Sequence, residues 1–494
     1  HTTVNVGDTA MQTIGPSWGE LNNKMALCIS HFAKRMTGLN LKLSPKAAIV
    51  SSLMKMSENF RDRMLADGLF FQAVAHHRDL GITHTAACMR PKHILLTRIS
   101  KSSNRINKIK QLAKVNKKAK HIFRASYMSA ATWGHSAAGL TPTAIVKLEQ
   151  QALSCAGLAK EGRCRTTGLV VHYGLMGGPM AQIIREVFLN WFQVVGILSN
   201  AGYLKQIRTE WHKAKQFVTS KQFPFNHITG IMTNVIALLQ SLGWRAWQFN
   251  RWQDPQGNFW NMDHRSPPLC VVKALVQTYV DRNLVRADEH FDGKGMSDGI
   301  DWDATLFVIR NLKKSKDYQK KSTLESILSA CCWPASRVAE AYPSKSNMCP
   351  RCGMYEETSF HTFWECPCNN LIDSDNIINT NNLIQNAAPD VDNQCLWMRG
   401  ILPNRLTSAP HNHLPAVNEL STSGNPKNLP PHQLFSSGTY FGDGSGGCHA
   451  KLPTARRCGV GVAQMDESNC INCSIKSNLP GDVQTVPRAE TFAL

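Results

Sequence analysis

Four residues near position 350 have the types and the spacing of a metal-binding cluster. Cys349, Cys352, His361 and Cys366 follow the pattern C-x2-C-x8-H-x4-C. The first pair is typical of a tight metal-binding turn, and the helix-like spacing of the second pair returns two ligands to the same point. Four protein ligands leave no open position for water, so the pattern predicts a structural zinc ion in a tetrahedral Cys3His site.

Two alternatives to this cluster remain open. Cys368 could take the place of Cys366 as the fourth ligand, and the pattern could be a chance grouping in a chain with 16 cysteines. The adjacent cysteines at 331–332 are expected to be unrelated. Because the cysteines show no framework spacing, we expect reduced thiols, as in a cytosolic or nuclear protein.

Two acidic residues near the end of the sequence could do hydrolytic chemistry. Asp443 ends a strand-like stretch that passes into a glycine turn, and Glu490 lies in a segment that enters a helix at Pro487. Further strands are expected over 457–463 and 470–475. If Asp443 ends a central strand and the helix packs across it, both carboxylates can converge on one magnesium ion. The alternative is that Asp443 is an ordinary turn residue.

The motifs around these acids resemble type 1 ribonuclease H. The D-G-S run at 443–445 and the Q-x-x-x-R-A-E run at 484–490 carry the resemblance. It implies a two-metal, magnesium-dependent hydrolysis of the RNA strand of an RNA–DNA hybrid. The family uses two further acids on a later strand and helix, and the sequence is expected to stop before both, which would impair activity. The positions implied to contact the hybrid are Gly444, Ser445, Gln484 and Arg488.

The first hundred residues resemble the polymerase palm of non-LTR retrotransposon reverse transcriptases. The runs V-G-D-T-A-M at 6–11, G-L-N-L-K-L-S-P-K at 38–46 and D-L-G-I at 79–82 follow the family's order of hairpin, helix, strand and primer-gripping hairpin. Gly7 stands where the family has one of two adjacent aspartates, which leaves Asp8 alone. Polymerase activity is therefore expected to be lost. Lys46 matches a lysine near the departing pyrophosphate, although it could equally be a surface lysine, and Asp8 a turn residue.

A long basic stretch follows, with no Asp or Glu from 80 to 148. Ile106, Ile109 and Leu112 recur at helical spacing, so an apolar stripe can face a core while cations face outward. Such a helix could follow a phosphate backbone, as the thumb of the resembled polymerases does; a merely solvated basic face is the alternative. The expected nucleic-acid-binding cations are Lys108, Lys110, Lys114, Lys117 and Lys118, within a set that also holds Arg98, Lys101, Arg105, Lys120 and Arg124.

Residues 142–340 are predicted to be mostly helical, with apolar periodicity over 144–153, 183–198 and 228–242. The run A-T-W-G at 131–134 resembles a segment that follows the thumb in the same elements. Four tryptophans lie close together in sequence, and core packing is favoured over stacking on bases. They are Trp244, Trp247, Trp252 and Trp260.

Composition is consistent with a nucleic-acid partner. The 494 residues carry a formal charge of +20 with a pI near 9.4, which favours a polyanion such as RNA or DNA. The most apolar segment, 187–198, is too short to span a bilayer. No signal peptide is found and the sequence begins with His1, so we expect an internal piece of a longer reading frame and a nuclear or cytoplasmic location.

The expected fold class is an α/β and α multi-domain chain. The leading functional hypothesis is a hybrid ribonuclease attached to a reverse-transcriptase remnant. A non-catalytic nucleic-acid-binding relic and a viral polyprotein segment are the alternatives. The expected domains are a palm remnant over 1–100, a basic thumb and helical connection over 101–340, a zinc knuckle over 345–370, a linker over 371–436, and the first half of a ribonuclease H domain over 437–494.

Overall fold

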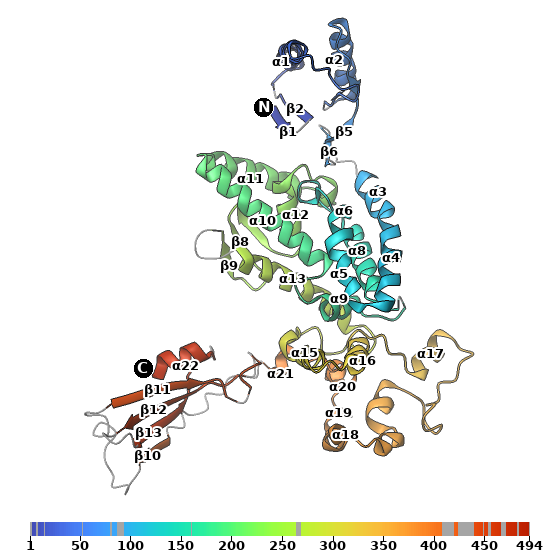
Figure 1. The fold of residues 1–494 in the computed structure, drawn as a ribbon, viewed down its shortest axis with the longest axis vertical. Coiled ribbons are helices and arrows are strands. Elements are labelled where there is room, and N and C mark those ends of the chain that lie inside the picture. Colours follow the sequence, from blue (N-terminus) through green and yellow to red (C-terminus); the bar gives the residue numbers. More distant parts are fainter. Residues whose placement is uncertain are drawn as a thin grey trace. The chain divides into compact units, whose positions relative to one another are not determined.

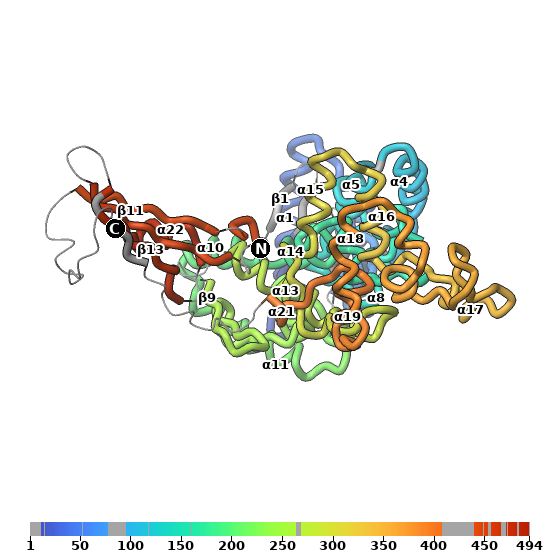
Figure 2. Tube along the Cα trace, turned by 90° about the horizontal axis from the view of Figure 1, so that it is seen from below, coloured from blue at the N-terminus to red at the C-terminus, as the bar shows by residue number. Residues whose placement is uncertain are grey.

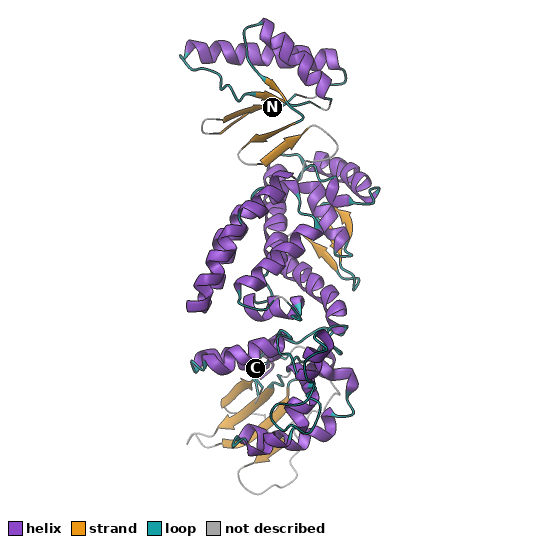
Figure 3. Cartoon of the chain, turned by 90° about the vertical axis from the view of Figure 1, so that its right-hand side faces the viewer, coloured by secondary structure: helices purple, strands orange, loops and turns teal. Residues whose placement is uncertain are grey.

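The computed structural model is helix-rich with small sheets, which agrees with a mixed α/β and α multi-domain chain (Figure 3). Contacts divide it into two compact units, one formed by His1–Lys160 and His172–Val280 and the other by Glu161–Val171 and Asp281–Leu494. The structure describes residues 2–5, 8–13, 15–51, 53–79, 82–85, 93–159, 161–262, 268–407, 419–422, 439–447, 449–452, 456–465, 471–481 and 484–493.

The first unit begins with the two predicted hairpins and a pair of helices. β1 (Thr2–Asn5) pairs antiparallel with β2 (Asp8–Met11), and β5 (His76–Asp79) pairs antiparallel with β6 (Ile82–Thr85). Between them lie α1 (Trp18–Gly38) and α2 (Met54–Ala66), drawn in blue in Figure 1. Their facing sides share a small core made of Ala26, Ile29, Phe60 and Met64.

The strand expected over 38–46 is not formed. Leu39 and Asn40 instead close α1: the Leu41 N–H donates to the Met36 carbonyl at 2.9 Å, and Asn40 adopts a φ of +57°. This left-handed residue reverses the chain before a strand can start. The pairing begins later, where β3 (Ala48–Ile49) lies parallel to β4 (Gln72–Ala73).

From His93 onward, the basic stretch folds into helices, as predicted. α3 (His93–Lys101) and α4 (Ser103–Val115) precede a short α5 (Lys120–Ile122) and a π-helical turn at Phe123–Met128. Ile106, Ile109 and Phe123 are buried, so the apolar stripe faces a core. Leu112 was expected in that stripe but is 48% exposed, one turn before the end of α4.

The three predicted apolar helices are present and form the centre of the first unit. They are α8 (Pro142–Cys155), α10 (Pro179–Asn200) and α12 (Ile231–Ser241), and α11 (Leu204–Thr219) packs with them. Thr141 caps α8 by accepting from the Ala144 N–H, and Pro142 occupies its first turn. Trp191 of α10 stacks near Trp211 of α11, with ring centroids 5.6 Å apart.

A three-stranded antiparallel sheet that the sequence did not predict follows α12. Its strands are β7 (Arg245–Gln248), β8 (Arg251–Gln253) and β9 (Phe259–Asn261), in that order. The strands are three or four residues long, too short for an alternating pattern to stand out in a Trp-rich segment. Two helices, α9 (Arg165–Tyr173) and α13 (Pro268–Asp288), each have one part in the first unit and one part in the second.

The second unit continues with helices on both sides of the cysteine cluster. Before the cluster lie α14 (Trp302–Thr305), α15 (Phe307–Lys314), α16 (Tyr318–Leu328) and α17 (Ala335–Ala341). After it lie α18 (Asp375–Thr380), α19 (Ile384–Ala387), α20 (Gln394–Arg399) and α21 (Asn404–Thr407).

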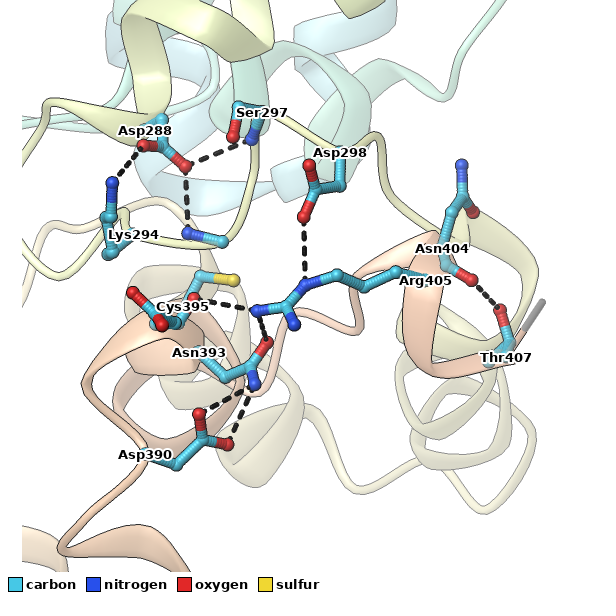
Figure 4. Close-up of polar contacts among 12 residues, drawn as sticks. Asp288, Lys294, Ser297, Asp298, Asp390, Asn393, Cys395, Asn404, Arg405 and Thr407 are labelled. Carbon is cyan, nitrogen blue, oxygen red and sulfur yellow. Dashed lines mark hydrogen bonds and ion pairs between the residues drawn. The ribbon is translucent and has the colours of Figure 1, made fainter. Parts of the chain in front are cut away.

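The expected linker of low structural content over 371–436 is instead folded into short helices over its described part, 371–407. The Arg405 guanidinium pairs with the Asp298 carboxylate at 2.8 Å and donates to the Asn393 side-chain oxygen at 2.7 Å (Figure 4). Asp390 accepts from the Asn393 amide at 2.8 Å. Cys395 is fully buried. The Asn- and Asp-rich composition thus supplies side-chain hydrogen bonds that fix short helices; residues 408–418 and 423–438 lie outside the described residues.

The last part of the second unit is a four-stranded antiparallel sheet with one helix. The strand order is β10-β13-β12-β11, and the helix α22 (Val486–Ala493) contacts β11 and β12 (Figures 1 and 2). The three strands that the sequence predicts are present, and β10 was not predicted. The core under α22 consists of Cys458, Val460, Leu479, Ala489 and Ala493. The strands are β10 (Glu419–Thr422), β11 (Thr439–Ser445), β12 (Gly459–Met465) and β13 (Ile471–Asn478).

No helix within the described ranges combines the length and the apolar character needed to cross a membrane.

Candidate metal centre and nuclease site

The four predicted metal ligands converge on one point. The ligand atoms of Cys349, Cys352, His361 and Cys366 all lie within 4.8 Å of one another. The two sulfurs of Cys349 and Cys366 are 4.0 Å apart, and the Cys352 sulfur is 3.5 Å from His361 Nε2. Bonds of about 2.3 Å to sulfur and 2.0 Å to nitrogen give tetrahedral edges of roughly 3.5–3.8 Å, so the donor set fits a zinc-sized ion.

A tight turn presents the first two ligands. The Gly353 N–H donates to the Cys349 carbonyl at 2.8 Å, and the Cys349 N–H donates to the Tyr355 carbonyl at 2.8 Å. Gly353 adopts a φ of +66°, a conformation that favours glycine at this turn. These bonds fold the chain back on itself directly after Cys352.

A π-helical turn presents the other two ligands. It runs over His361–Glu365, and the His361 N–H at its start donates to the Thr358 hydroxyl oxygen at 3.0 Å. The Cys366 N–H donates to the His361 carbonyl at 2.8 Å. The wider π turn brings Cys366, five residues after His361, back to the same side as the histidine ring.

Arg351 joins the two halves of the cluster. Its guanidinium donates to the Thr362 carbonyl at 2.7 Å and to the Asn369 side-chain oxygen at 2.8 Å. This role of Arg351 was not predicted from the sequence, although Arg351 lies between Cys349 and Cys352, two of the potential ligands. Tyr355 packs its ring 5.7 Å from the His361 ring, which helps to bury the histidine.

Cys368 is not one of the converging ligands. Its thiol donates to the Arg351 carbonyl at 3.4 Å, and it does not belong to the group that gathers around one point. Cys331 and Cys332 also lie outside that group. The placement of the side chains thus gathers Cys366, and not Cys368, with the other three potential ligands.

The pKa values of the two thiols Cys349 and Cys366 are shifted in opposite directions. Burial by itself would raise the pKa of the Cys349 thiol, but the N–H groups of Cys352 and Arg351 outweigh it and lower the pKa to about 6. Burial raises the pKa of the Cys366 thiol to about 11, and the neighbouring Cys349 adds to the rise. A cation bound between the two sulfurs would offset both the burial and the neighbouring sulfur that raise the pKa of Cys366, and so would favour its thiolate.

The two predicted nuclease acids lie on segments that touch. A Cβ added to Gly444 would stand 2.5 Å from the Glu490 backbone nitrogen, and one added to Gly442 would stand 2.6 Å from the Ala493 carbonyl oxygen. The glycines thus let α22 lie directly on β11. Asp443 stands between these glycines, opposite Gly461 of β12, and Asp443 and Glu490 are both exposed.

Strand geometry directs the Asp443 side chain away from this contact. Successive side chains of a strand point to opposite faces, so Asp443 projects from the face of β11 that does not touch α22. Its Oδ1 accepts from the Gly444 N–H at 2.9 Å. To share an ion with Glu490 of α22, the Asp443 carboxylate would have to reach around β11, which is an edge strand of the sheet, and the convergence of both carboxylates stays a prediction.

Gln484 has a structural task in this region. Its amide donates to the carbonyls of Leu479 at 2.9 Å and Gly481 at 2.6 Å, and its oxygen accepts from the Cys458 N–H at 2.8 Å. Both amide hydrogens are used within the fold, so a contact with a hybrid would have to replace one of these bonds. The Arg488 guanidinium lies near Gly481, and the Ser445 hydroxyl lies near Gly459.

The polymerase-like residues form no cluster that the structure describes. Asp8 begins β2 opposite Asn5 of β1, whereas Gly7 lies outside the described residues. Lys46 is exposed on the loop after α1, and its N–H donates to the Ser44 hydroxyl at 3.2 Å. The roles implied for Asp8 and Lys46 stay predictions.

The basic helix α4 presents its cations to solvent. Lys108, Lys110 and Lys114 are exposed, while Ile106 and Ile109 on the same helix are buried. Lys118 after the helix is exposed as well, and the side chain of Lys117 lies outside the description. This is the two-faced arrangement that the sequence predicts, and it leaves the lysines able to meet a polyanion.

The chain matches no family model, no curated protein and no solved structure.

Proposed function

We propose that this chain binds RNA–DNA hybrids and hydrolyses their RNA strand at Asp443 and Glu490, as a ribonuclease H of the type attached to retrotransposon reverse transcriptases. The observation that carries the proposal is the close contact of Gly444 with the backbone of Glu490. It joins the D-G-S and R-A-E motifs across 46 positions of sequence, counted from residue 444 to residue 490.

The order of elements around this contact supports the same proposal. Three antiparallel strands, β11, β12 and β13, are followed by α22, which returns to pack on the first of them. Asp443 and Glu490 are both open to solvent at this place, where a phosphodiester could approach. Gly442 and Gly444 keep the strand and the helix within backbone contact, which brings the two segments that carry the acids together.

Magnesium in this site is part of the proposal. Within the described part of the chain, the group of three or more potential ligands that gathers around one point is the Cys3His cluster, and Asp443 and Glu490 do not belong to it. Two carboxylates alone would hold the ion. When bound, magnesium would activate a water molecule and stabilise the leaving oxygen.

The metal in the Cys3His cluster is proposed to be structural zinc. Four protein ligands leave no position for a substrate, and two of them, Cys349 and Cys366, are at most 2% exposed. Together with α4, whose lysines are exposed, the cluster would serve nucleic-acid binding rather than chemistry.

One observation favours a second function, that of a non-catalytic nucleic-acid-binding protein. The cluster and the basic face of α4 are complete within the described residues, whereas the nuclease site offers two carboxylates. A protein that binds without cleaving would need nothing beyond the cluster and the basic helix.

Cleavage of a labelled RNA–DNA hybrid in magnesium separates these functions. We expect Asp443→Asn to lower the cleavage rate at least about 100-fold while hybrid binding is retained, because a metal-holding carboxylate is lost. Asp373→Asn is the matched control. It changes an exposed acid 70 positions before Asp443 and should cleave like the wild type. Equal rates for wild type and Asp443→Asn would remove the catalytic assignment; binding with no cleavage in either would support the second function.

A further inference from the structure

The Trp-rich segment of residues 244–260 divides into a buried and an exposed part. Trp252 is completely buried and meets the Phe188 ring at 5.4 Å, and Trp244 is 3% exposed with its ring 5.9 Å from Trp260. These three tryptophans pack within the fold, as their sequence favours. Trp247 and Phe259 are different, because they are 49% and 51% exposed.

The register of the sheet gathers exposed residues on one face. Arg245 lies opposite Gln253, which lies opposite Phe259, so these three residues form one row. Arg251 lies between Gln248 and Asn261 in the neighbouring row. Residues directly opposite one another share a face. Trp252 alternates to the other face, which is the buried one.

Trp247 belongs to the same outer face. The register shifts between Ala246 and Gln248, so Trp247 occupies a bulge. Its indole N–H donates to the Gln253 side-chain oxygen at 3.4 Å, which connects the ring to the row that contains Arg245 and Phe259. An exposed indole fixed by a hydrogen bond offers a flat ring with little loss of conformational entropy on binding.

The charge on this face is positive. The Arg251 guanidinium stacks over the Phe259 ring at 4.6 Å, and Arg245 is exposed. Asp254, the acid between β8 and β9, is 8% exposed and accepts from the Asn258 side chain at 3.0 Å and from the Trp260 indole at 3.0 Å. Its charge is thus held inside the turn and does not oppose an anion on the outer face.

We propose that the outer face of β7, β8 and β9 is a stacking platform for single-stranded nucleic acid. Trp247 and the face of Phe259 that Arg251 does not cover would stack with unpaired bases, and Arg245 and Arg251 would meet the adjacent phosphates. A duplex presents no free base faces to such rings, so the platform selects an unpaired strand. This function goes beyond hybrid cleavage, because it requires neither Asp443 nor Glu490.

Binding of a short fluorescein-labelled oligouridylate, followed by fluorescence anisotropy, tests the platform. Moderately raised salt weakens the contribution of the α4 lysines, because phosphate contacts are salt-dependent and stacking is much less so. We expect Trp247→Ala and Phe259→Ala each to weaken binding about fivefold or more. Trp247→Phe, which keeps an aromatic ring, should stay within about threefold of the wild type.

A non-aromatic variant decides between stacking and simple apolar contact. Trp247→Leu should bind as weakly as Trp247→Ala, because leucine lacks a π face. Tyr318→Ala removes a 64% exposed ring of α16 in the other unit and should leave binding unchanged. Circular-dichroism melting checks that each variant is folded. Binding by Trp247→Leu equal to that of the wild type would overturn the platform.

A second copy of this chain is the other occupant that an aromatic face could take. If sedimentation velocity shows a dimer that Trp247→Ala dissociates, while oligouridylate binding is unchanged, the platform proposal is wrong. Asp443→Asn should bind oligouridylate like the wild type. Loss of hybrid cleavage in that variant, with the Trp247 effect intact, shows that the two proposals stand or fall separately.

Discussion

The sulfur atoms of Cys349 and Cys366 lie 4.0 Å apart although 17 positions separate them in the sequence. A tight turn and a π-helical turn bring them together, and Arg351 connects the two turns through the Thr362 carbonyl. Two buried thiols this close are stable side by side when a cation lies between them. The cluster is therefore where removal of a metal should affect the fold most.

Zinc content is the first expected consequence. The purified chain should carry close to one zinc ion by inductively coupled plasma mass spectrometry, and Cys366→Ser should lose it, because a tetrahedral site then lacks one ligand. Cys368→Ser is the matched control: its thiol contacts the Arg351 carbonyl and should be dispensable for the metal. A Cys368→Ser protein without zinc would show that the ligand set is wrong.

The contact between β11 and α22 should tolerate no side chain at Gly444. Gly444→Ala places a methyl group 2.5 Å from the Glu490 nitrogen, so α22 must shift, at a cost of about 1–3 kcal/mol in the free energy of unfolding. Gly461→Ala is the control, because its Cβ would meet nothing within 4 Å on the neighbouring strand. Hydrogen exchange over 439–493 measures the effect, and equal protection in both variants would contradict the close contact.

Acid should weaken the first unit through His135. Burial lowers the pKa of His135 below its ordinary 6.5 despite Glu186, whose carboxylate lies 3.6 Å away. A histidine that stays neutral when folded binds fewer protons than in the unfolded chain, so the free energy of unfolding falls as the pH drops below about 6.5. Urea unfolding at pH 7.5 and pH 5.5 measures this difference.

His135→Gln should reduce that pH dependence, because glutamine does not titrate. His31→Gln changes an exposed histidine of α1 and should leave the pH dependence of the free energy of unfolding as in the wild type. The same pH dependence in His135→Gln and wild type would assign the acid sensitivity to another group.

Nucleic-acid affinity should depend on the exposed lysines of α4. Replacing Lys108, Lys110 and Lys114 by glutamine removes three cations, so the salt dependence of duplex binding, as the slope of log K against log salt, should flatten by up to about 2.7. The same replacement of Lys313, Lys314 and Lys316, which are exposed at and after the end of α15, is the control. An unchanged slope in the α4 variant would leave that helix as a solvated basic face.

The local parts of the chain were predictable from sequence because their geometry is local. Cys349 and Cys352 define a turn by their own spacing, and the periodic apolar residues of α8, α10 and α12 define helices without reference to the rest of the fold. The glycines flanking Asp443 and the run before Glu490 predicted a strand and a helix, and both are present.

The remaining parts depend on contacts between distant residues. The segment that contains Asn393 and Cys395 has the composition of a linker, but Arg405 and Asp298 tie it into a folded region. Asn40 ends α1 with a left-handed turn where a strand was expected, and its sequence neighbours do not show this. The outer face of Trp247 and Phe259 exists because of strand register, which a run of aromatic residues does not reveal by itself.

The single amide of Gln484 connects three points of backbone, at Cys458, Leu479 and Gly481. It therefore links the strand ends at Cys458 and Leu479 to the segment that precedes α22. A molecule that took over these hydrogen bonds would release the segment that leads into α22. The position of Glu490, six residues after Gln484, would then be less firmly held.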